Sequence, residues 1–326
     1  MNEIEKKPKS LIMCVTPLQM LIAEKIIELK SDESFDLLVV ALNDNEKYRT
    51  YFERVKKHCV NSLYYVQGKR RLFFFIKELR KNSLGIKYNN YYLASIDSIY
   101  FQYIISKNKH SDVFTFDDGT ANIIPSSLYY SDSKPEFLKR VVWRVLGVKH
   151  YMSHLKEKSL LHYTIYKDIP NIIDNQQYIS LIPLDYENQS VLKDKIIRFY
   201  LGQPLTDISK SFDLSFVKNN IDKLKVDYYY PHPREKVYPE GNYQIVESPL
   251  IFEDYIVQFL KDNPNESIEV YSFTSTALIN IMSLDRIQVT YIHDNQFFKL
   301  YKSFYEFSEE LFGIPHLDLD SAEIRI

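Results

Sequence analysis

Two patterns of apolar and polar residues alternate along the first 116 positions of the chain. Short continuous apolar runs, beginning with Leu11–Val15, suit strands that are buried on both faces, and the segments between them repeat apolar residues at helical spacing. The pattern predicts strands at 11–15, 35–42, 62–66, 90–94 and 112–116, and helices at 18–29, 46–58, 72–81 and 98–107. Such an alternation predicts a parallel sheet with helices on both faces.

A second series of the same kind begins near residue 195, after a more irregular stretch that contains a basic amphipathic helix at 136–146. It predicts strands at 196–201, 226–230, 243–246, 267–271 and 286–292, and helices at 207–224, 251–260, 277–283 and 297–312. We therefore expect two Rossmann-like, doubly wound α/β domains, 1–190 and 191–326, that face a central cleft. In sheets of this type, ligands bind beyond the carboxyl ends of the strands.

Composition narrows the classes of ligand and partner. The chain has only 7 glycines and lacks both GxGxxG and GxxxxGK[ST], so a phosphate would have to be held by side chains and helix N-termini. The net charge of −2 does not indicate the excess of positive charge that is typical of a nucleic-acid-binding protein. Cys14 and Cys59 have no metal-ligand spacing and indicate thiols in a reducing compartment. No segment has the ~18 apolar residues of a membrane-spanning helix.

The sequence PHPRE at 231–235 follows the predicted strand 226–230 and holds one histidine between two prolines. Each proline fixes its own φ and restricts the residue before it, so His232 is held rigidly at the strand exit. An imidazolium in this place can donate to a phosphate oxygen and can protonate a leaving group near neutral pH. The alternative is a turn in which His232 only faces solvent.

The junction between strand 267–271 and helix 277–283 carries four hydroxyl groups in the sequence SFTST. Hydroxyls and unpaired N–H groups at a helix start can bind an anion, although capping by Thr274 or Ser275 would use the same donors. Glu253 and Asp254 open helix 251–260. They could accept hydrogen bonds from ribose hydroxyls, or they could simply interact favourably with the helix dipole.

Two adjacent carboxylates, Asp117 and Asp118, end the strand 112–116 and precede Gly119. Neighbouring side chains on a strand point to opposite faces, so at most one carboxylate is expected to enter a cleft as a general base. The alternative is an Asp-Gly turn with a solvated carboxylate. A metal site is not predicted, because no further carboxylate or histidine lies nearby in the sequence.

These motifs occur in one order: FDDGTANI at 116–123, HYTIY at 162–166, LGQP at 201–204, PHPRE at 231–235, ESPLIFEDYI at 247–256 and EVYSFTSTAL at 269–278. With LIMCVTPLQMLIAEKI at 11–26, the series resembles the family-52 bacterial sialyltransferases, known for the lipooligosaccharide α-2,3-sialyltransferases of Gram-negative pathogens. The likeness runs from about residue 10 to residue 315.

The resemblance implies a GT-B-like fold, CMP-N-acetylneuraminate as the donor, inversion at the anomeric carbon and no essential metal or other cofactor. His232 would contact the CMP phosphate and act as the general acid, Pro233 would shape its turn, and Glu253 would hold the cytidine ribose. Ser272, Ser275 and Thr276 would bind the phosphate through their hydroxyls and the N–H groups at the helix start. The same motifs complete the expected donor site: Gly202, Gln203, Ser248, Ser272, Phe273, Thr274, Ser275 and Thr276.

The chain departs from the family pattern at the expected general base. In the lipooligosaccharide enzymes, an aspartate directly follows a Gly-Ser-Pro turn. Here Gly202-Gln203-Pro204 is followed by Leu205, and the next aspartate is Asp207. Either this loop is reshaped so that Asp207 serves as the base, which we favour, or the base is Asp118 or Asp117.

The resemblance predicts a sialyltransferase that acts on a terminal galactoside of a bacterial surface glycan, either lipooligosaccharide or capsule. It also predicts a homodimer. The basic helix around Trp143 could contact a membrane surface or a partner subunit, and the alternative that we favour is that it packs on its own chain or on the second copy of a dimer. The polar N-terminal segment does not have the pattern of a signal peptide, so we expect a cytoplasmic protein, or one held at the inner face of the membrane.

Two other function classes stay open on the sequence alone. One is a GT-B glycosyltransferase that uses another nucleotide sugar in capsule or lipopolysaccharide synthesis. The other is a non-catalytic nucleotide-binding or assembly protein.

Overall fold

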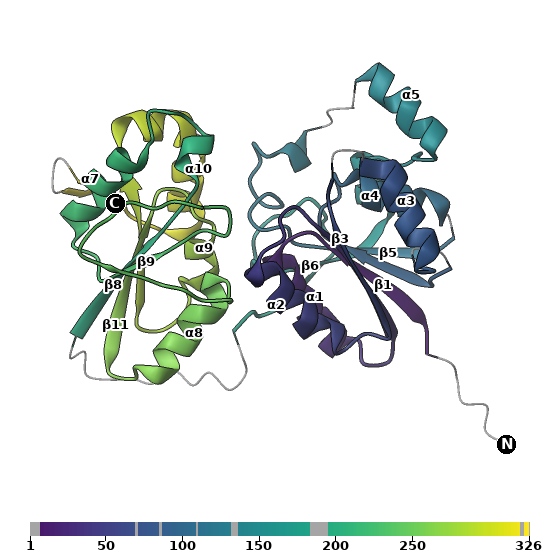
Figure 1. Ribbon diagram of the computed structural model, residues 1–326, viewed down its shortest axis with the longest axis horizontal. Coiled ribbons are helices and arrows are strands. Elements are labelled where there is room, and N and C mark those ends of the chain that lie inside the picture. The colour runs from purple at the N-terminus through teal and green to yellow at the C-terminus, as the bar shows by residue number, and fades with distance from the viewer. Residues whose placement is uncertain are drawn as a thin grey trace. The chain divides into compact units, whose positions relative to one another are not determined.

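The computed structural model describes residues 7–68, 71–84, 87–108, 110–131, 136–182, 195–319 and 323–325. The chain forms two compact units, residues 1–181 and residues 182–326 (Figure 1). The predicted domain boundary at 190 falls within 183–194, outside the described residues. In the part of the chain that is described, each unit contains one seven-stranded sheet.

Unit 1 is a doubly wound domain. Its elements are β1 (Lys9–Cys14), α1 (Pro17–Leu29), β2 (Ser34–Ala41), α2 (Glu46–Lys56), β3 (Asn61–Val66), α3 (Arg71–Lys81), β4 (Asn90–Leu93), α4 (Ile99–Lys107), β5 (Asp112–Phe116), η1 (Leu128–Tyr130), α5 (Phe137–Leu146), α6 (Met152–Lys158), β6 (Ser159–Thr164) and β7 (Gln176–Tyr178). The strand order is β3-β2-β1-β4-β5-β6-β7, and each pairing is parallel. Figure 1 shows α1 and α2 on one face of the sheet and α3 and α4 on the other.

The apolar runs of unit 1 form the centre of its sheet. Leu11 to Cys14 in β1 have no exposed surface, because helices cover both faces of the strand. Thr16 then caps α1 by accepting a hydrogen bond from the N–H of Gln19 (3.3 Å), with Pro17 in the first turn. Helix α1 therefore begins directly at the carboxyl edge of the sheet.

Unit 2 has the same design. Its elements are β8 (Lys195–Leu201), η2 (Leu205–Asp207), α7 (Leu214–Leu224), β9 (Tyr228–Tyr230), β10 (Gln244–Ile245), α8 (Phe252–Asp262), β11 (Glu266–Ser272), α9 (Ala277–Ile281), β12 (Ile287–His293), α10 (Asn295–Phe312), β13 (His316–Asp318) and β14 (Glu323–Arg325). The strand order is β10-β9-β8-β11-β12-β13-β14, parallel except for the β13–β14 pair. The order reverses between β8 and β11, the type of position at which doubly wound sheets bind ligands.

The predicted class of two doubly wound domains is confirmed by both sheets. The irregular stretch expected after residue 125 contains additional elements, α6, β6 and β7. Strand β6 escaped prediction because it is rich in polar residues, and His162 and Thr164 within it are buried through hydrogen bonds. The helix expected from Asp207 begins only at Leu214, because Asp213 caps it by accepting from the N–H of Phe216 (2.9 Å).

Helix α5 differs from the other long helices of unit 1, because no residue within it is buried. It ends at Gly147, whose φ of 103° is the left-handed conformation that glycine adopts readily at a helix C-terminus. Figure 1 shows α5 projecting from the rest of its unit. No helix in the described ranges is both long and apolar enough to cross a bilayer.

Candidate functional site

Four of the sequence motifs meet at one edge of unit 2. Strands β10, β9, β8 and β11 are consecutive neighbours in the sheet, and all of them run parallel. The loops that leave their carboxyl ends carry ESPL, PHPRE, GQP and SFTST, in that order across the sheet. The fold therefore places the predicted donor-binding segments side by side, on both sides of the point where the strand order reverses.

The turn after β9 fixes the ring of His232. Its Nδ1 accepts a hydrogen bond from the N–H of Arg234 (3.1 Å), and its carbonyl accepts from the N–H of Glu235 (2.9 Å). The ring is half-buried. Because Nδ1 is an acceptor, Nε2 carries the proton of the neutral ring and is the atom that can donate to a ligand.

The loop after β8 is joined to the loop after β11 by the side chain of Gln203. Its Oε1 accepts from the N–H of Thr274 (2.9 Å) and from the hydroxyl of Ser272 (3.2 Å), while its Nε2 donates to the Thr274 hydroxyl (3.2 Å). Gln203 thus uses both ends of its amide to hold the SFTST segment. Gln203, which is predicted to belong to the donor site, therefore connects the loop after β8 to the loop after β11.

The SFTST segment divides into interior and accessible residues. Ser272 is fully buried and donates its hydroxyl to the carbonyl of Leu201 (3.0 Å), and Phe273 is fully buried against Phe297 (ring centroids 4.9 Å apart). Their side chains are therefore engaged in the interior, which differs from the expectation that the Ser272 hydroxyl contacts phosphate. Thr274, Ser275 and Thr276 are only half-buried at the start of α9 and keep hydroxyl groups near the surface.

Ser248 and Glu253 border the same edge from the β10 side. The Ser248 hydroxyl accepts from the N–H of Leu250 (3.2 Å) in the loop that leads into α8. Glu253, in the first turn of α8, accepts from the side-chain amide of Asn280 in α9 (2.8 Å). The carboxylate is half-buried, so it stabilises the contact between the two helices and still faces partly toward solvent.

Asp207 lies on the same edge, in the short turn η2 that follows the GQP loop. Its side chain is 64% exposed and forms an ion pair with Arg234, with an N···O distance of 3.8 Å. Arg234 contacts both groups: its backbone N–H donates to the ring of His232, and its guanidinium pairs with the carboxylate of Asp207. The structure therefore brings Asp207 into the neighbourhood of the histidine turn.

Asp117, in unit 1, is completely buried. It accepts hydrogen bonds from His162 Nε2 (2.9 Å), the Thr164 hydroxyl (2.7 Å), the N–H of Ile165 (2.7 Å) and Asn171 Nδ2 (3.0 Å). Such a carboxylate links β5 to β6 and to the segment beyond it. A general base has to reach a substrate hydroxyl, and this side chain has no exposed surface with which to do so.

Asp118 is half-buried at the carboxyl edge of unit 1. Its carboxylate accepts from the Ser95 hydroxyl (3.0 Å), the Tyr129 hydroxyl (2.6 Å) and the amide of Gln19. The Tyr129 hydroxyl also donates toward Asp97 (3.0 Å), and burial raises the pKa of both Tyr129 and Asp97. Sequence reasoning did not identify these partners, because they lie in α1, in η1 and in the segment between β4 and α4, which are separate in the sequence.

Glu235 is a further residue of the site that the sequence did not single out. Its carboxylate lies beneath the His232 turn, and burial raises its pKa, an effect that hydrogen bonds from His232, Tyr229 and Gln203 oppose. Its position at the end of the PHPRE motif was the only available signal. Within the described ranges, no three His, Cys, Asp or Glu side chains gather as metal ligands.

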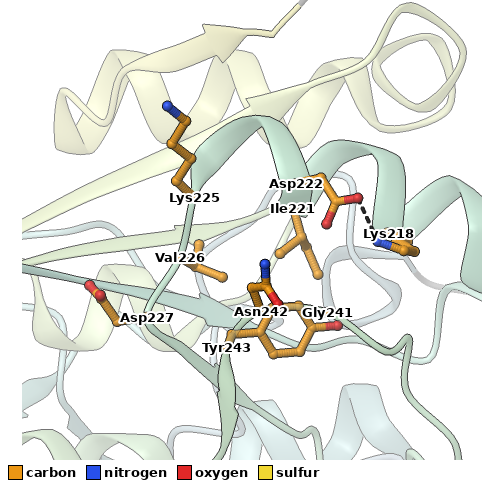
Figure 2. Close-up of a pocket in the computed structure, with 9 residues that line it drawn as sticks. All are labelled: Lys218, Ile221, Asp222, Lys225, Val226, Asp227, Gly241, Asn242 and Tyr243. Atoms are coloured by element: carbon orange, nitrogen blue, oxygen red, sulfur yellow. Dashed lines mark hydrogen bonds and ion pairs between the residues drawn. The ribbon is translucent and has the colours of Figure 1, made fainter.

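A pocket of about 570 Å³ lies elsewhere in unit 2 (Figure 2). It is lined by the end of α7 and by residues that precede β9 and β10: Lys218, Ile221, Asp222, Lys225, Val226, Asp227, Gly241, Asn242 and Tyr243. These residues stand at the amino ends of the strands, so the pocket opens at the edge opposite the four motifs. Lys218 and Asp222 form an ion pair at its margin (2.5 Å).

The model of glycosyltransferase family 52 matches residues 33–296. The chain is 33% identical over 314 residues to the CMP-N-acetylneuraminate:beta-galactoside alpha-2,3-sialyltransferase of Pasteurella multocida. The matched region covers 95% of this chain and 99% of that protein. It is 34% identical over 289 residues to an N-acetyllactosaminide alpha-2,3-sialyltransferase of Haemophilus influenzae, with 87% and 91% covered.

Two solved structures share the fold at low sequence identity. One is the glycotransferase of kitacinnamycin, with a TM-score of 0.52, 9% identity and coverage of 98% of this chain and 88% of that one. The other is a UDP-glucosyltransferase from Polygonum tinctorium, with a TM-score of 0.52, 10% identity and coverage of 98% and 87%. Both are similar to this chain along nearly its whole length, and they confirm the GT-B type of fold.

Proposed function

This chain belongs to glycosyltransferase family 52, and on that premise we propose that it is an inverting sialyltransferase that moves N-acetylneuraminate from CMP-N-acetylneuraminate to a terminal galactoside. The observation that carries the proposal is the adjacency of the PHPRE, GQP and SFTST loops at the carboxyl edge of one sheet. The activities for which the relatives from Pasteurella and Haemophilus are named support the donor, the galactoside acceptor and the α-2,3 linkage.

The donor phosphate is proposed to bind between the histidine turn and the start of α9. His232 donates from Nε2, the Ser275 and Thr276 hydroxyls donate from the other side, and Glu253 accepts from the cytidine ribose. These donors stabilise the negative charge that grows on CMP as the glycosidic bond breaks. His232 becomes a general acid when Nδ1 is also protonated, which requires its hydrogen bond from Arg234 to open.

Asp207 is the general base that we propose for the acceptor hydroxyl. It takes the hydroxyl proton while the acceptor oxygen bonds to the anomeric carbon and CMP departs from the opposite face, so the configuration inverts. Its exposed carboxylate lies on the same edge as His232 and is accessible to a second substrate. Asp118, which already accepts from three side chains, is the weaker candidate, and buried Asp117 is the weakest.

We propose that the reaction needs neither a metal nor another cofactor. The CMP phosphate carries one negative charge, and hydroxyl, N–H, imidazole and guanidinium groups stand at the proposed site to balance it. Ser275, Thr276, His232 and Arg234 supply these groups. Activity that persists in EDTA would agree with this proposal, and activity restored only by a divalent cation would contradict it.

We also propose that the protein is a dimer whose contact includes α5. Five apolar side chains form one exposed stripe on this helix: Phe137 (69% exposed), Leu138 (77%), Val141 (47%), Val142 (57%) and Val145 (82%). The opposite side of α5 packs on its own unit through Trp143 and Leu146. A contiguous apolar stripe of this kind is typical of an interaction surface.

The acceptor is proposed to be a galactoside of lipooligosaccharide or capsule, reached by an enzyme that works in the cytoplasm or at the inner membrane surface. Cys14 and Cys59 are free thiols, in agreement with a reducing compartment.

A donor assay tests the proposed function directly. Purified protein is incubated with a β-galactoside and with CMP-N-acetylneuraminate, UDP-galactose or GDP-mannose, and both nucleotide release and the glycan product are measured. We expect CMP release and a sialylated product with CMP-N-acetylneuraminate alone, and nuclear magnetic resonance should assign an α-2,3 linkage. Turnover of a UDP- or GDP-sugar instead would favour the other glycosyltransferase class. Nucleotide binding without any product would favour an assembly protein.

A further inference from the structure

The carboxylate of Glu235 connects two loops of the proposed donor site. Oε2 accepts from the N–H of His232 (2.7 Å), and Oε1 accepts from the hydroxyl of Tyr229 in β9 (2.9 Å). The backbone of Gln203, in the loop after β8, acts on the same carboxylate and opposes the rise in its pKa. One half-buried side chain thus accepts from the histidine turn and from the strand before it, and it lies against the neighbouring loop.

This contact continues into the third loop through Gln203. The Gly202–Gln203 backbone lies against the Glu235 carboxylate, while the side-chain amide of Gln203 holds Ser272 and Thr274. A continuous chain of contacts therefore runs from His232 through Glu235 and the Gly202–Gln203 loop to the SFTST segment. The position of the imidazole relative to the phosphate-binding hydroxyls is set by this chain.

The absence of a side chain at Gly202 allows the carboxylate of Glu235 to approach the loop after β8 closely. A Cβ built on this glycine would overlap Oε2 of Glu235 and would lie 2.7 Å from the Tyr229 hydroxyl and 2.9 Å from its ring. Both contacts are shorter than real Cβ atoms allow, so a side chain at 202 would push Glu235 away from its donors. The glycine is required here by close approach, since its φ is not in the left-handed region.

We propose that Glu235 is a positioning residue of the sialyl transfer reaction, which fixes the His232 turn against the Gly202–Gln203 loop and needs glycine at position 202 to do so. The inference rests on the proposed function. Glu235 itself touches no substrate, because its carboxylate is occupied by protein donors. Its removal should therefore mainly lower kcat, and it should affect donor affinity less.

The test is a double-mutant cycle with Glu235→Ala and Gly202→Ala, supported by Glu235→Gln. The amide introduced by Glu235→Gln would offer one acceptor oxygen and turn an NH₂ group toward donors, so this variant keeps the size of the side chain but loses hydrogen bonds. We expect each single variant to lower kcat by about 10- to 100-fold, the scale on which small misplacement of catalytic groups acts.

The two substitutions should be less than additive, because both disturb the Glu235 contact, while the overlap of a Cβ at 202 with Tyr229 remains in either background. Adding Gly202→Ala to the Glu235→Ala variant should therefore lower kcat by a smaller factor than it does in the wild type. Gly241→Ala is the matched control: its Cβ would overlap the ring of Tyr243, but at the opposite edge of the sheet (Figure 2). We expect it to leave kcat unchanged and to combine additively with Glu235→Ala.

Melting temperatures separate positioning from folding. A purely structural role would lower the melting temperature of Glu235→Gln but leave kcat of the folded enzyme intact, and that result would overturn the proposal. If the wild-type enzyme transfers no sialic acid, the proposed function fails instead. The contact can still be tested then, because Gly202→Ala should lower the melting temperature of the wild type more than that of Glu235→Ala, in which only the overlap with Tyr229 is left.

Discussion

His232 is the residue on which the proposed chemistry depends most directly. Replacing it with alanine removes the Nε2 donor that would stabilise the leaving phosphate, and we expect kcat to fall by about 10²- to 10⁴-fold. Glutamine at this position places an amide NH₂ group at about the reach of Nε2 and should retain more activity than alanine. Steady-state kinetics with CMP-N-acetylneuraminate measure both variants. A rate near that of the wild type for His232→Ala would remove this residue from the mechanism.

The three candidate bases differ in their surroundings, so their alanine variants should differ in whether they lose activity or stability. Asp207→Ala should lose transfer but keep its melting temperature, because the side chain is exposed. Asp117→Ala should lower the free energy of unfolding by about 3–5 kcal/mol, because it leaves four buried donors without their acceptor. Asp118→Ala provides the comparison. Full activity in Asp207→Ala would show that the base lies elsewhere.

At the scale of elements, short polar contacts decide how neighbouring strands and helices fit together. The PHPRE turn, the GQP loop and the start of α9 are separate in sequence and are joined through the carboxylate of Glu235 and the amide of Gln203. In unit 1, β5 and β6 are joined through Asp117 and His162 in the same way. Polar residues that look misplaced in a strand pattern are thus the ones that bind adjacent elements.

Strand β13 contains a histidine that should make stability depend on pH. His316 is buried, with its ring 4.9 Å from that of Tyr305, and burial lowers its pKa, an effect that Glu309 opposes and His293 reinforces. In the unfolded chain the ring titrates near about 6.5. Below that pH the unfolded state binds a proton more readily than the folded state does. The stability that comes from burying the neutral ring is therefore present above the unfolded pKa and is lost as pH falls through the folded pKa.

We therefore expect the melting temperature to fall between about pH 7.5 and pH 5, and His316→Phe should reduce that dependence. Substitution of the exposed His110 by Asn should leave it unchanged. Calorimetric melting curves across this range provide the measurement. The same slope in His316→Phe as in the wild type would assign the effect to other groups.

For the whole molecule, the apolar stripe of α5 leads to a prediction about assembly. Glutamate at both Val142 and Val145 places two charges in the proposed dimer contact, so this variant should be a monomer where the wild type is a dimer. Light scattering after size-exclusion chromatography measures the mass. Lys139→Glu, a charge change on the same exposed helix, is the control and should stay dimeric. A monomeric wild type that binds anionic lipid vesicles would indicate a membrane surface in place of a second copy.

Much of the fold and part of the site followed from the sequence. The runs at 11–15 and 112–116 and the helix at 136–146 were predicted within a residue or two of β1, β5 and α5, because continuous burial and helical spacing are local properties. The strands β6, β7, β13 and β14 were missed. In β6 the polar residues are buried through partners that are distant in the chain, as His162 is through Asp117. Strand β7 is only three residues long and has no buried residue.

The order of motifs along the chain was sufficient to determine the family and the fold class, because residue type and spacing survive when most other positions change. Tertiary structure alone decided which of those residues are buried and which are exposed. It buried Asp117, Ser272 and Phe273, left Asp207 exposed, and set Glu235 beneath the histidine turn. The reason is physical: exposure and hydrogen-bond partners depend on which strands become neighbours, and parallel neighbours are joined by long crossovers that no local pattern encodes.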